Sequence, residues 1–433
     1  MNKTSRIYLD YAASTPVDPA VLKAMAPYFT EKFGNPGSLH SFGQEAMGAV
    51  DKARGAIAKA IAPSLADGFR SIIFTSSATE ANNLALRGIF KASDFISKQN
   101  RSPKIIISGI EHESILDTAR DLGKDACLRR QGVEVVYLPV DENGIVDLKK
   151  LESSLDERTV LVSVMYVNNE IGSVQPIAKI SEIIRNFREE LRIKNKESNK
   201  TYSKFIIHNS LFPLLHTDAA QALNYFDCDV KKLGVDLMTL SGQKIYGPKG
   251  IGALFIRNNE SGIRNNEERK DSIIHNSKFL IPVITGGGQE FGLRSGTENV
   301  PAIVGFGKAM ELATKNRSKN MKEVNSLKNE FWRGLKKIYP QAEINGKSGA
   351  PHILNIHFPT EFAGDLLIKL DIAGIAVSAG SACSARSYAP SPVLHALGLS
   401  QERVRGSLRF SFGKPCKMGE IKEALKRMRK ILV

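Results

Sequence analysis

Residues Asp236-Leu-Met-Thr-Leu-Ser-Gly-Gln-Lys244 lead from an apolar run into a short polar turn, and Pro248-Lys-Gly-Ile-Gly252 leads back into a second apolar run, Ala253-Leu-Phe-Ile256. The pattern predicts two buried strands joined by a glycine-rich turn. A lysine that is desolvated between buried strands offers a neutral amine for chemistry. The alternative is an exposed lysine in a hairpin turn, since the chain contains 60 lysine and arginine residues. Other segments of the chain favour the first interpretation.

Apolar runs of strand length alternate with helical patterns from about residue 70 onward. Continuous apolar strands separated by helices predict an α/β fold with a mostly parallel sheet covered on both faces. A long polar helix at 311–338 leads to a smaller C-terminal α+β unit, so we expect a large domain at 17–310 and a small domain made of 1–16 and 311–433. The expected strands are 72–75, 104–108, 133–137 and 160–164, and the expected helices are 42–61, 80–90, 115–122 and 176–188.

The composition indicates a cytoplasmic globular enzyme. No apolar run approaches the ~20 residues of a membrane span. Four cysteines without a C-x-x-C spacing argue against a disulfide framework and a zinc site. The net charge of +15 would suit an anionic partner, but the basic residues are scattered and no basic module interleaved with aromatic residues is present. We therefore expect no membrane association and no direct nucleic-acid function.

Residues suited to bind a phosphate group and a pyridine ring accompany the amine of Lys244 in the sequence. Amines of this kind form Schiff bases, and pyridoxal phosphate is the commonest cofactor that uses them. Backbone N–H groups at Ala78 and Thr79, where a strand runs into a helix, can hold a phosphate dianion. Asp218 can keep a pyridine nitrogen protonated, and Gln221 can donate to the phenolic oxygen of the ring. Ordinary helix caps are the alternative for the first three residues.

Three further residues follow or lie in apolar runs. His112 has a pKa near neutrality in its free form and can stack on a ring and move protons. Arg409 lies in the strand-like Ser407-Leu-Arg-Phe-Ser411, where an unpaired guanidinium would be costly, so we expect it to meet an anion such as a substrate carboxylate. Asn169 ends another strand and can bind the cofactor or that carboxylate. A structural histidine is the alternative for His112.

Cys383 differs from the other cysteines because it lies in a run of small residues, Ser378-Ala-Gly-Ser-Ala-Cys-Ser384. This composition predicts an exposed loop, whereas Cys127 and Cys228 have half-apolar surroundings. A thiol on such a loop can reach into a site, attack and withdraw. A glycine- and serine-rich linker with an incidental cysteine is the alternative.

Taken in order, these segments resemble the cysteine desulfurases of the NifS/IscS type, in the class V aminotransferase group of pyridoxal-phosphate enzymes of fold type I. The resemblance covers almost the whole chain. It is carried by Tyr8-Leu-Asp-Tyr-Ala-Ala13, Phe33-Gly-Asn-Pro36, Phe74-Thr-Ser-Ser-Ala-Thr-Glu80, Glu111-His112, Val167-Asn-Asn-Glu-Ile-Gly172, Thr217-Asp-Ala-Ala-Gln221, Ser241-Gly-Gln-Lys-Ile-Tyr-Gly-Pro-Lys-Gly250, Gly286-Gly-Gly-Gln-Glu290, Arg294-Ser-Gly-Thr-Glu-Asn299, Ser378-Ala-Gly-Ser-Ala-Cys-Ser384 and Leu408-Arg-Phe-Ser411.

The resemblance implies a large domain with a seven-stranded sheet and a role for each candidate residue. Cys383, Lys244 and His112 would be catalytic, with Lys244 holding the cofactor and Cys383 receiving sulfur from L-cysteine as a persulfide while L-alanine leaves. Asn169 and Arg409 would bind the substrate. The cofactor-binding set would be Ala78, Thr79, His112, Asn169, Asp218, Gln221, Ser241, Gln243, Lys244 and Thr297.

The resemblance also implies partners. Thr297 would reach the phosphate of a neighbouring subunit, so a homodimer with shared sites is expected. The persulfide would pass to a sulfur-acceptor protein, either an iron–sulfur scaffold or a tRNA-thiolation protein. A selenocysteine lyase, an ordinary class V aminotransferase and a non-catalytic sulfur-relay scaffold subunit are the alternatives. Cys383 favours a desulfurase, because neither selenium release nor transamination needs that thiol.

Three departures from the family pattern stand out. Position 243 is Gln where relatives usually have His, and since Gln cannot be cationic we expect weaker retention of the cofactor. Two polar stretches, 189–215 and 258–281, are longer than in typical relatives and predict surface excursions. The chain ends at Val433 without the extended tail by which some relatives bind the scaffold protein, which puts that docking mode in doubt.

Overall fold

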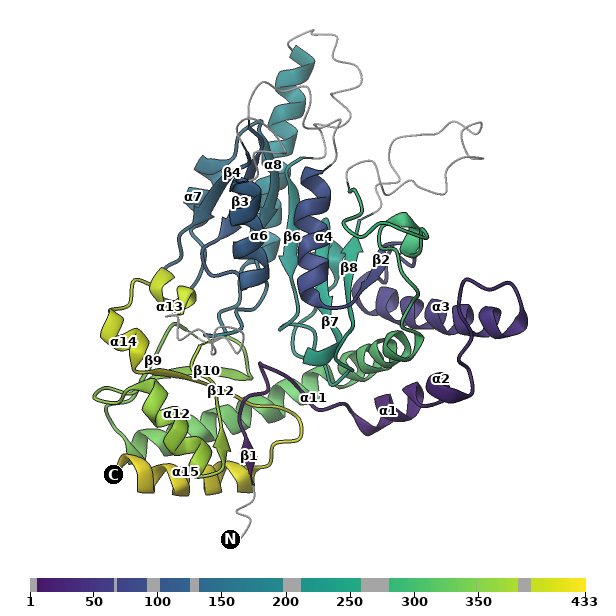
Figure 1. Cartoon of the computed structure of the whole chain (residues 1–433). Coiled ribbons are helices and arrows are strands. Elements are labelled where there is room, and N and C mark those ends of the chain that lie inside the picture. The colour runs from purple at the N-terminus through teal and green to yellow at the C-terminus, as the bar shows by residue number, and fades with distance from the viewer. Residues whose placement is uncertain are drawn as a thin grey trace.

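The computed structural model describes residues 6–65, 68–91, 102–124, 132–197, 212–257, 280–347, 349–380 and 391–433. A seven-stranded sheet forms the centre of the large part of the molecule, and a smaller unit with its own sheets lies beside it (Figure 1). The strand order β2-β8-β7-β6-β5-β3-β4 confirms the expected mostly parallel sheet, in which only β8 runs antiparallel to its neighbours. The strands are β2 (Ile72–Thr75), β3 (Lys104–Ser108), β4 (Glu134–Leu138), β5 (Thr159–Ser163), β6 (Leu214–Asp218), β7 (Leu237–Ser241) and β8 (Gly252–Ile256).

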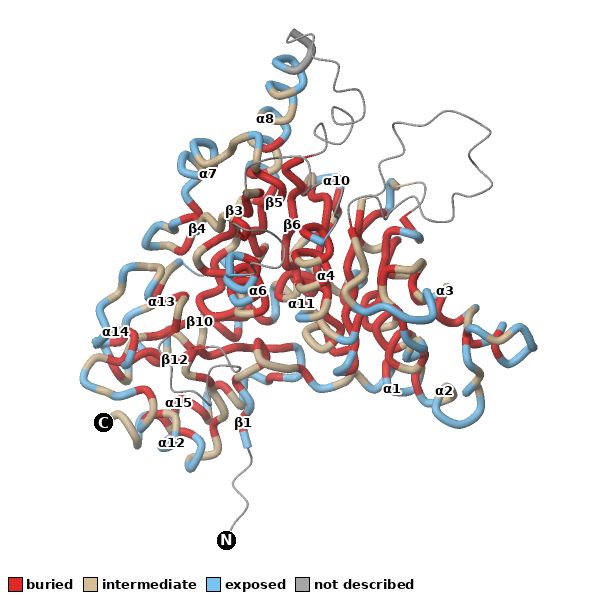
Figure 2. Tube along the Cα trace, turned by 45° about the horizontal axis from the view of Figure 1, so that its top comes forward, coloured by how far each residue is buried: buried red, intermediate tan, exposed pale blue. Residues whose placement is uncertain are grey.

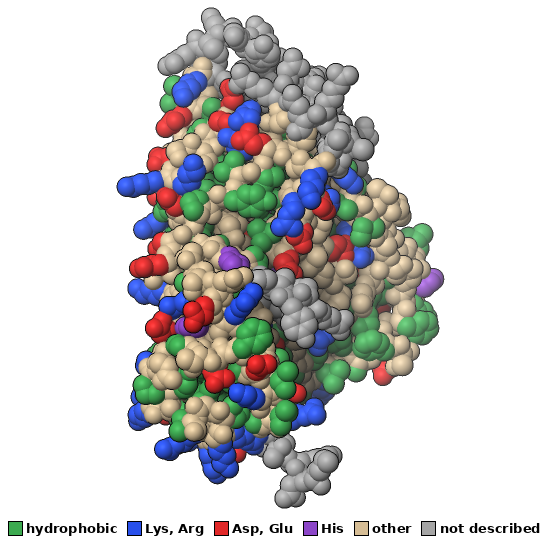
Figure 3. All heavy atoms as spheres, turned by 60° about the vertical axis from the view of Figure 1, so that its left-hand side comes forward, with side chains coloured by type: hydrophobic (Ala, Val, Ile, Leu, Met, Phe, Trp, Pro, Cys, Tyr) green, Lys and Arg blue, Asp and Glu red, His purple; other side chains and the backbone are tan. Residues whose placement is uncertain are grey.

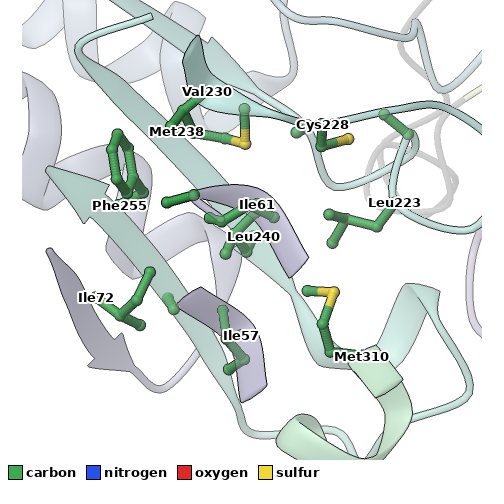
Figure 4. Packing of buried hydrophobic residues seen from close by; sticks show 14 of the residues in the cluster. Ile57, Ile61, Ile72, Leu223, Cys228, Val230, Met238, Leu240, Phe255 and Met310 are labelled. Atoms are coloured by element: carbon green, nitrogen blue, oxygen red, sulfur yellow. The ribbon is translucent and has the colours of Figure 1, made fainter. Parts of the chain in front are cut away.

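Helices cover both faces of this sheet because both faces of its strands are apolar. Alternate strand residues enter different clusters: Ile106 packs in one, and Ile105 and Ile107 pack in the other. The first cluster includes residues of α3 (Ser41–Ile61), α8 (Ile177–Glu197) and α11 (Val300–Ile338), and Figure 4 shows part of its packing. The second includes residues of α4 (Ala78–Phe90) and α6 (Glu113–Lys124). Such two-sided burial is what continuous apolar strands require. The short helices α7 (Leu148–Ser154) and α10 (Val230–Leu233) complete this part.

The smaller unit is built around an antiparallel sheet with the order β12-β10-β9 and a parallel pair, β1-β11. A separate hydrophobic cluster fills it, and α11 contributes to both regions: Ala313 lies in the large cluster, whereas Val324 and Phe331 lie in the small one. We propose that these clusters mark two domains, at 17–310 and at 1–16 plus 311–433. The elements are β1 (Ile7–Tyr8), β9 (Glu343–Ile344), β10 (Ile353–His357), β11 (Ile375–Ala376), β12 (Ser407–Ser411), α12 (Ala363–Ile372), α13 (Pro392–Ala396), α14 (Gln401–Arg405) and α15 (Met418–Leu432).

Two predictions about the polar segments were wrong in extent. Helix α11 begins at Val300, well before residue 311, because Asn299 caps it and its first turns are buried. Helix α8 continues to Glu197, since Glu, Arg and Lys are good helix formers and do not end a helix by their polarity. The end of the first expected excursion, 212–215, is buried and leads into β6, so this part of the prediction was also wrong. Residues 198–211 and 258–279 lie outside the described residues.

Burial and charge follow the layered architecture. Buried positions run along the central strands, and exposed positions lie on the outer faces of the helices (Figure 2). Lys and Arg side chains are interspersed with Asp and Glu side chains over the face that Figure 3 shows. Among the described helices, none combines the length and apolarity needed to cross a membrane.

A buried ion pair connects α3 to the segment that leads into α11. The guanidinium of Arg54 donates to both carboxylate oxygens of Glu290, at 2.8 Å and 2.7 Å, and the backbone N–H of Phe74 donates to the same carboxylate at 2.8 Å. Both charged side chains are almost fully shielded from solvent. Breaking such a pair leaves one uncompensated buried charge, which costs far more than breaking an exposed pair.

We therefore expect Glu290→Ala to lower the free energy of unfolding by about 3–5 kcal/mol, as measured by urea denaturation. The control is Glu45→Ala, which removes the half-exposed pair with Lys32 at 2.6 Å and should change stability far less, because exposed ion pairs contribute little. Equal effects of the two substitutions would contradict the structural role assigned to Glu290.

Candidate active site

The candidate residues lie where neighbouring parallel strands end. His112 follows β3, Asn169 follows β5, Asp218 ends β6, and Lys244 follows β7. Since β3, β5, β6 and β7 pair in parallel, their carboxyl ends share one edge of the sheet, which is where open α/β sheets bind ligands. The backbone confirms this closeness, because the N–H of Tyr166, just after β5, donates to the carbonyl of Asp218 at 2.9 Å.

Lys244 is the last residue of a 3₁₀ turn, Gly242–Lys244, directly after β7. Its Nζ donates to the carbonyl oxygens of Ala12 and Ala13, at 2.6 Å each. Thr15 also binds this turn, since its Oγ1 donates to the carbonyl of Gln243 at 2.8 Å. The N-terminal segment therefore forms one wall of the site, although none of its residues was individually predicted as a site residue. The apolar Leu9 and polar Asp10 next to it were the available signal.

A chain of hydrogen bonds joins the predicted ring contacts, Asp218 and His112. The side-chain N–H₂ group of Asn82 donates to Asp218 Oδ2 and to Ser114 Oγ, at 2.8 Å each. Ser114 Oγ lies 2.9 Å from His112 Nδ1, and the backbone N–H of Ala220 donates to Asp218 Oδ1 at 2.9 Å. Asn82 and Ser114 were not predicted as site residues, although a polar residue inside the buried face of α4 is an unusual feature that points to such a role.

The electrostatics of this chain favour a neutral His112. Burial lowers its pKa, and the charge of Lys244 adds to this, whereas the charge of Asp218 acts in the opposite direction. The backbone N–H of Ser114 donates to His112 Nδ1 at 3.0 Å, so that nitrogen is an acceptor and the proton of the neutral ring is on Nε2. Burial also raises the pKa of the neighbouring Glu111 well above its usual value. At neutral pH the ring is therefore uncharged, and its Nε2 N–H group is a hydrogen-bond donor.

The predicted phosphate cradle is assembled by the sheet register around Gly252. Thr75 on β2 and Ser241 on β7 both pair with Gly252 on β8, which brings the start of α4 beside the end of β7. A Cβ at Gly252 would lie 2.5 Å from the carbonyl carbon of Ser77 and 2.8 Å from the backbone nitrogen of Ala78. Only glycine fits this close approach. The first-turn N–H groups of α4, which include those of Ala78 and Thr79, point away from the helix and suit an anion.

Arg409 lies on β12 and is 1% exposed. As expected it meets an anion, but that anion is Asp10, whose Oδ1 accepts from Nη2 at 2.9 Å. Nη1 donates to the carbonyl of Asn169 at 2.8 Å, so the two predicted substrate contacts touch each other. Among the described residues, neither Arg409 Nε nor Asn169 Oδ1 has a hydrogen-bond partner, although both atoms are buried. Buried polar atoms of this kind indicate a ligand with complementary groups.

Gln221 and Lys244 share one hydrogen-bond acceptor, the carbonyl oxygen of Ala12. The Nε2 of Gln221 donates to this carbonyl at 2.9 Å, and the Oε1 of Gln221 lies 3.2 Å from His352 Nε2. Thr297 is exposed, in the segment before α11, and no contact of its side chain with the residues named above is described. The structure thus brings together all predicted residues of this site except Thr297 and Cys383.

Cys383 lies outside the described residues, as does Cys127. The two described cysteines do not suit nucleophilic chemistry. Burial raises the thiol pKa of Cys228 and of Cys416 to about 12, so both stay protonated. Figure 4 shows Cys228 among apolar side chains such as Leu223 and Val230.

The residues present fit pyridoxal phosphate. They combine an anion cradle, where Gly252 leaves no room for a side chain, with a carboxylate at Asp218. His112 adds an imidazole that donates a hydrogen bond, and Lys244 adds an amine. The unpartnered Asn169 Oδ1 and Arg409 Nε add polar groups for an amino-acid substrate. This donor set matches the needs of the cofactor, namely an anion site, a pyridinium partner and a Schiff-base lysine.

Comparisons with known proteins agree with this interpretation. The family model of class V aminotransferases matches residues 7–191 and 204–423. The chain is 40% identical to cysteine desulfurase IscS 1 of Archaeoglobus fulgidus, over 94% of this chain and 92% of the relative. It is also 40% identical to the mitosomal cysteine desulfurase of Trachipleistophora hominis, over 98% and 85%.

Solved structures give the same result. A NifS-like protein superposes with a TM-score of 0.79 at 34% identity, covering 99% of both chains. A structure of SspA in complex with cysteine superposes with a TM-score of 0.71 at 32% identity, covering 94% of this chain and 98% of SspA. These matches confirm the resemblance and the fold class that the sequence motifs indicate.

The close approach at Gly252 yields a test of the phosphate cradle. We expect Gly252→Ala to raise the dissociation constant for pyridoxal phosphate about 10-fold or more, a loss of ~1.4 kcal/mol, because the first turn of α4 must shift. Equilibrium titration of the apoprotein, followed by visible absorption, measures this change. The control is Gly48→Ala in α3, where an added Cβ meets nothing within 4 Å. Unchanged affinity in Gly252→Ala would show that the cradle lies elsewhere.

Proposed function

We propose a cysteine desulfurase activity for this chain, which belongs to the aminotransferase class-V family of pyridoxal-phosphate-dependent enzymes. In this reaction L-cysteine yields L-alanine, and its sulfur remains on Cys383 as a persulfide. The observation that carries the proposal is that Lys244, His112 and Asp218 lie at the carboxyl ends of β7, β3 and β6, where Asn82 and Ser114 connect His112 to Asp218. Relatives named cysteine desulfurase and a related structure that contains cysteine support the same substrate.

The cofactor would be held by residues from several strands. Lys244 would hold it covalently through its amine, and Asp218 would keep the ring nitrogen protonated. Ala78 and Thr79 at the N-terminus of α4, together with Ser241 and Gln243, would bind its phosphate. Pyridoxal phosphate, when bound, supplies an electron sink that acidifies the α-hydrogen of the amino acid and weakens its bond to sulfur. Since Gln243 donates without a positive charge, it contributes less to anion binding than a cationic histidine would.

Each remaining residue binds, orients or moves a proton. Arg409 and Asn169 bind the carboxylate of the substrate, which fixes the direction of its side chain. Asp10 holds the guanidinium of Arg409, and Ser378 Oγ in turn donates to Asp10 Oδ2 at 2.9 Å. The amine of Lys244 would accept the α-proton of the substrate. His112 would offer a hydrogen bond from its Nε2 N–H group.

The sulfur step balances without an external oxidant. The thiolate of Cys383 attacks the sulfur of cysteine, so an S–S bond forms and the carbon–sulfur bond breaks. The electron pair of the broken bond stays on carbon, which takes a proton and becomes the methyl group of alanine. The product, a persulfide on Cys383, is passed to a sulfur-acceptor protein for iron–sulfur cluster assembly or tRNA thiolation. We also propose a cytoplasmic location, because a reducing compartment keeps the thiol of Cys383 available.

The proposed nucleophile can be tested against a cysteine that the structure makes inert. We expect Cys383→Ala to keep the yellow colour of the bound cofactor and to lose alanine formation from L-cysteine to background. Cys228→Ala is the control, because the pKa of about 12 keeps its thiol protonated, and it should retain alanine formation. Radiolabelled cysteine followed by gel analysis without reductant should label the wild type and Cys228→Ala but not Cys383→Ala. Full alanine formation by Cys383→Ala would refute the role of that thiol.

We further propose that the active enzyme is a homodimer formed around the N-terminal helices. Large apolar side chains lie exposed around α1 (Pro19–Met25), α2 (Pro27–Thr30) and the start of α3, which project from one side of the molecule (Figure 1). Contiguous exposed apolar surface marks an association site. A second copy of the chain is the expected occupant, and Thr297 of each chain would reach the phosphate of the other. The exposed residues are Leu22, Phe29, Phe33, Leu39 and Phe42.

The dimer surface gives a direct prediction. We expect the double substitution Phe33→Glu and Leu39→Glu to convert the dimer into monomers, as measured by light scattering, because two charges would be buried against apolar surface. Ile372→Glu is the control, since Ile372 on α12 is 79% exposed, compared with 91% for Leu39, but lies outside this surface. A dimer that survives the double substitution would place the contact elsewhere.

A further inference from the structure

A buried histidine, His352, lies behind the ring contact Gln221. It precedes β10 and is 3% exposed. Its ring stacks on that of Tyr225, with centroids 4.4 Å apart and planes inclined by 23°. Its Nε2 lies 3.2 Å from Gln221 Oε1. None of the sequence motifs named above includes His352, and the proposed reaction does not use it.

The two contacts of the Gln221 amide determine its orientation. One end faces the carbonyl oxygen of Ala12 at 2.9 Å, which can only accept a hydrogen bond, so this end must be the N–H₂ group. The other end is therefore the amide oxygen, and it faces His352 Nε2. Since an amide oxygen only accepts, His352 must carry its proton on Nε2. The orientation follows from the chemistry of the three groups.

The surroundings of His352 keep it in this neutral form. Burial lowers its pKa to about 3, and positive charges at Lys328 on α11, Arg409 on β12 and Lys244 after β7 act in the same direction. Among the described residues, its Nδ1 has no hydrogen-bond partner, so a second ring proton would gain nothing. A neutral ring has a single N–H, and Gln221 takes it.

We infer that His352 is a positioning residue that, together with the carbonyl of Ala12, fixes the amide of Gln221 so that its N–H₂ group, and not its oxygen, serves the phenolic oxygen of the cofactor. The same N–H₂ group and the amine of Lys244 already meet at one atom, the carbonyl oxygen of Ala12. An amide turned the other way would place two oxygens against each other at both Ala12 and the ring. This inference rests on the cofactor proposed above.

The test uses the visible absorption of the holoenzyme as a function of pH. A hydrogen-bond donor to the phenolic oxygen stabilises the ionised form of that oxygen. Loss of a fixed donor therefore raises the pH at which half of the absorption change has occurred, which is the midpoint used below. We expect His352→Leu to raise this midpoint by about one unit and to weaken binding of pyridoxal phosphate about 10-fold. His352→Asn, which keeps an N–H donor, should restore the midpoint to within ~0.3 units of the wild type.

A second pair of variants separates positioning from packing. In a Gln221→Leu background, His352→Leu should leave the midpoint unchanged, because the amide that it orients is gone. A merely structural role would lower the melting temperature of every His352 variant and leave the midpoint in place. Should His352→Leu fail to fold, nitrogen-15 chemical shifts of the wild-type imidazole, assigned with His352→Asn, provide the answer. Protonated Nε2 and bare Nδ1 support the inference.

The inference is overturned if His352→Leu leaves the midpoint unchanged, or if the proton of His352 is found on Nδ1. Its failure differs from failure of the proposed function. A wild-type protein that binds pyridoxal phosphate but forms no alanine from L-cysteine would refute the desulfurase, while the pH midpoints would still decide the role of His352.

Discussion

The common direction of β3, β5, β6 and β7 is the constraint on which the site depends. Parallel pairing places the carboxyl ends of all four strands at one edge, so residues that are far apart in sequence meet without long loops. Only β8 reverses, and its reversal brings Gly252 between β2 and β7 at that same edge. The anion cradle and the amine of Lys244 therefore share one boundary of the sheet. A slip by one residue would turn Gly252 away and set a side chain against α4.

The N-terminal segment connects this edge to the small unit. Asp10 binds Arg409 of the small unit, whereas Ala12 accepts from both Lys244 and Gln221 of the large one. One short stretch of the chain thus connects the amine of Lys244 with the guanidinium of Arg409. Because the contacts of Ala12 use its carbonyl oxygen, its side chain carries no chemical signal. This explains why inspection of chemically active side chains does not find this wall.

The sequence predicts the fold and most of the site for one reason: strands that are buried on both faces have an unmistakable apolar pattern, and their ends are where chemistry lies. Lys244, Asp218 and His112 follow from this rule. Asn82 and His352 do not, because each contacts another polar residue of the site and each has apolar neighbours in sequence, Asn82 within α4 and His352 just before β10. The ion pair of Arg409 with Asp10 joins residues from opposite ends of the chain, and residue spacing says nothing about such contacts. The prediction of helix ends fails for a different reason. The polar composition after residue 188 suggests the end of a helix, but α8 continues through this stretch to Glu197.

A final regularity concerns charge. The ionisable side chains of Asp218 and Arg409 each have close hydrogen-bonding partners, whereas burial shifts the pKa of other titratable groups near them toward the uncharged form. These groups are Glu111, whose pKa is raised by burial, and His112 and His352, whose pKa values are lowered by burial. Neutral neighbours add hydrogen-bond direction without adding a field that would compete with a bound phosphate and carboxylate. The site thus separates two tasks, since a few charges bind the ionic groups of its ligands and the buried neutral rings and amides determine how those ligands are oriented.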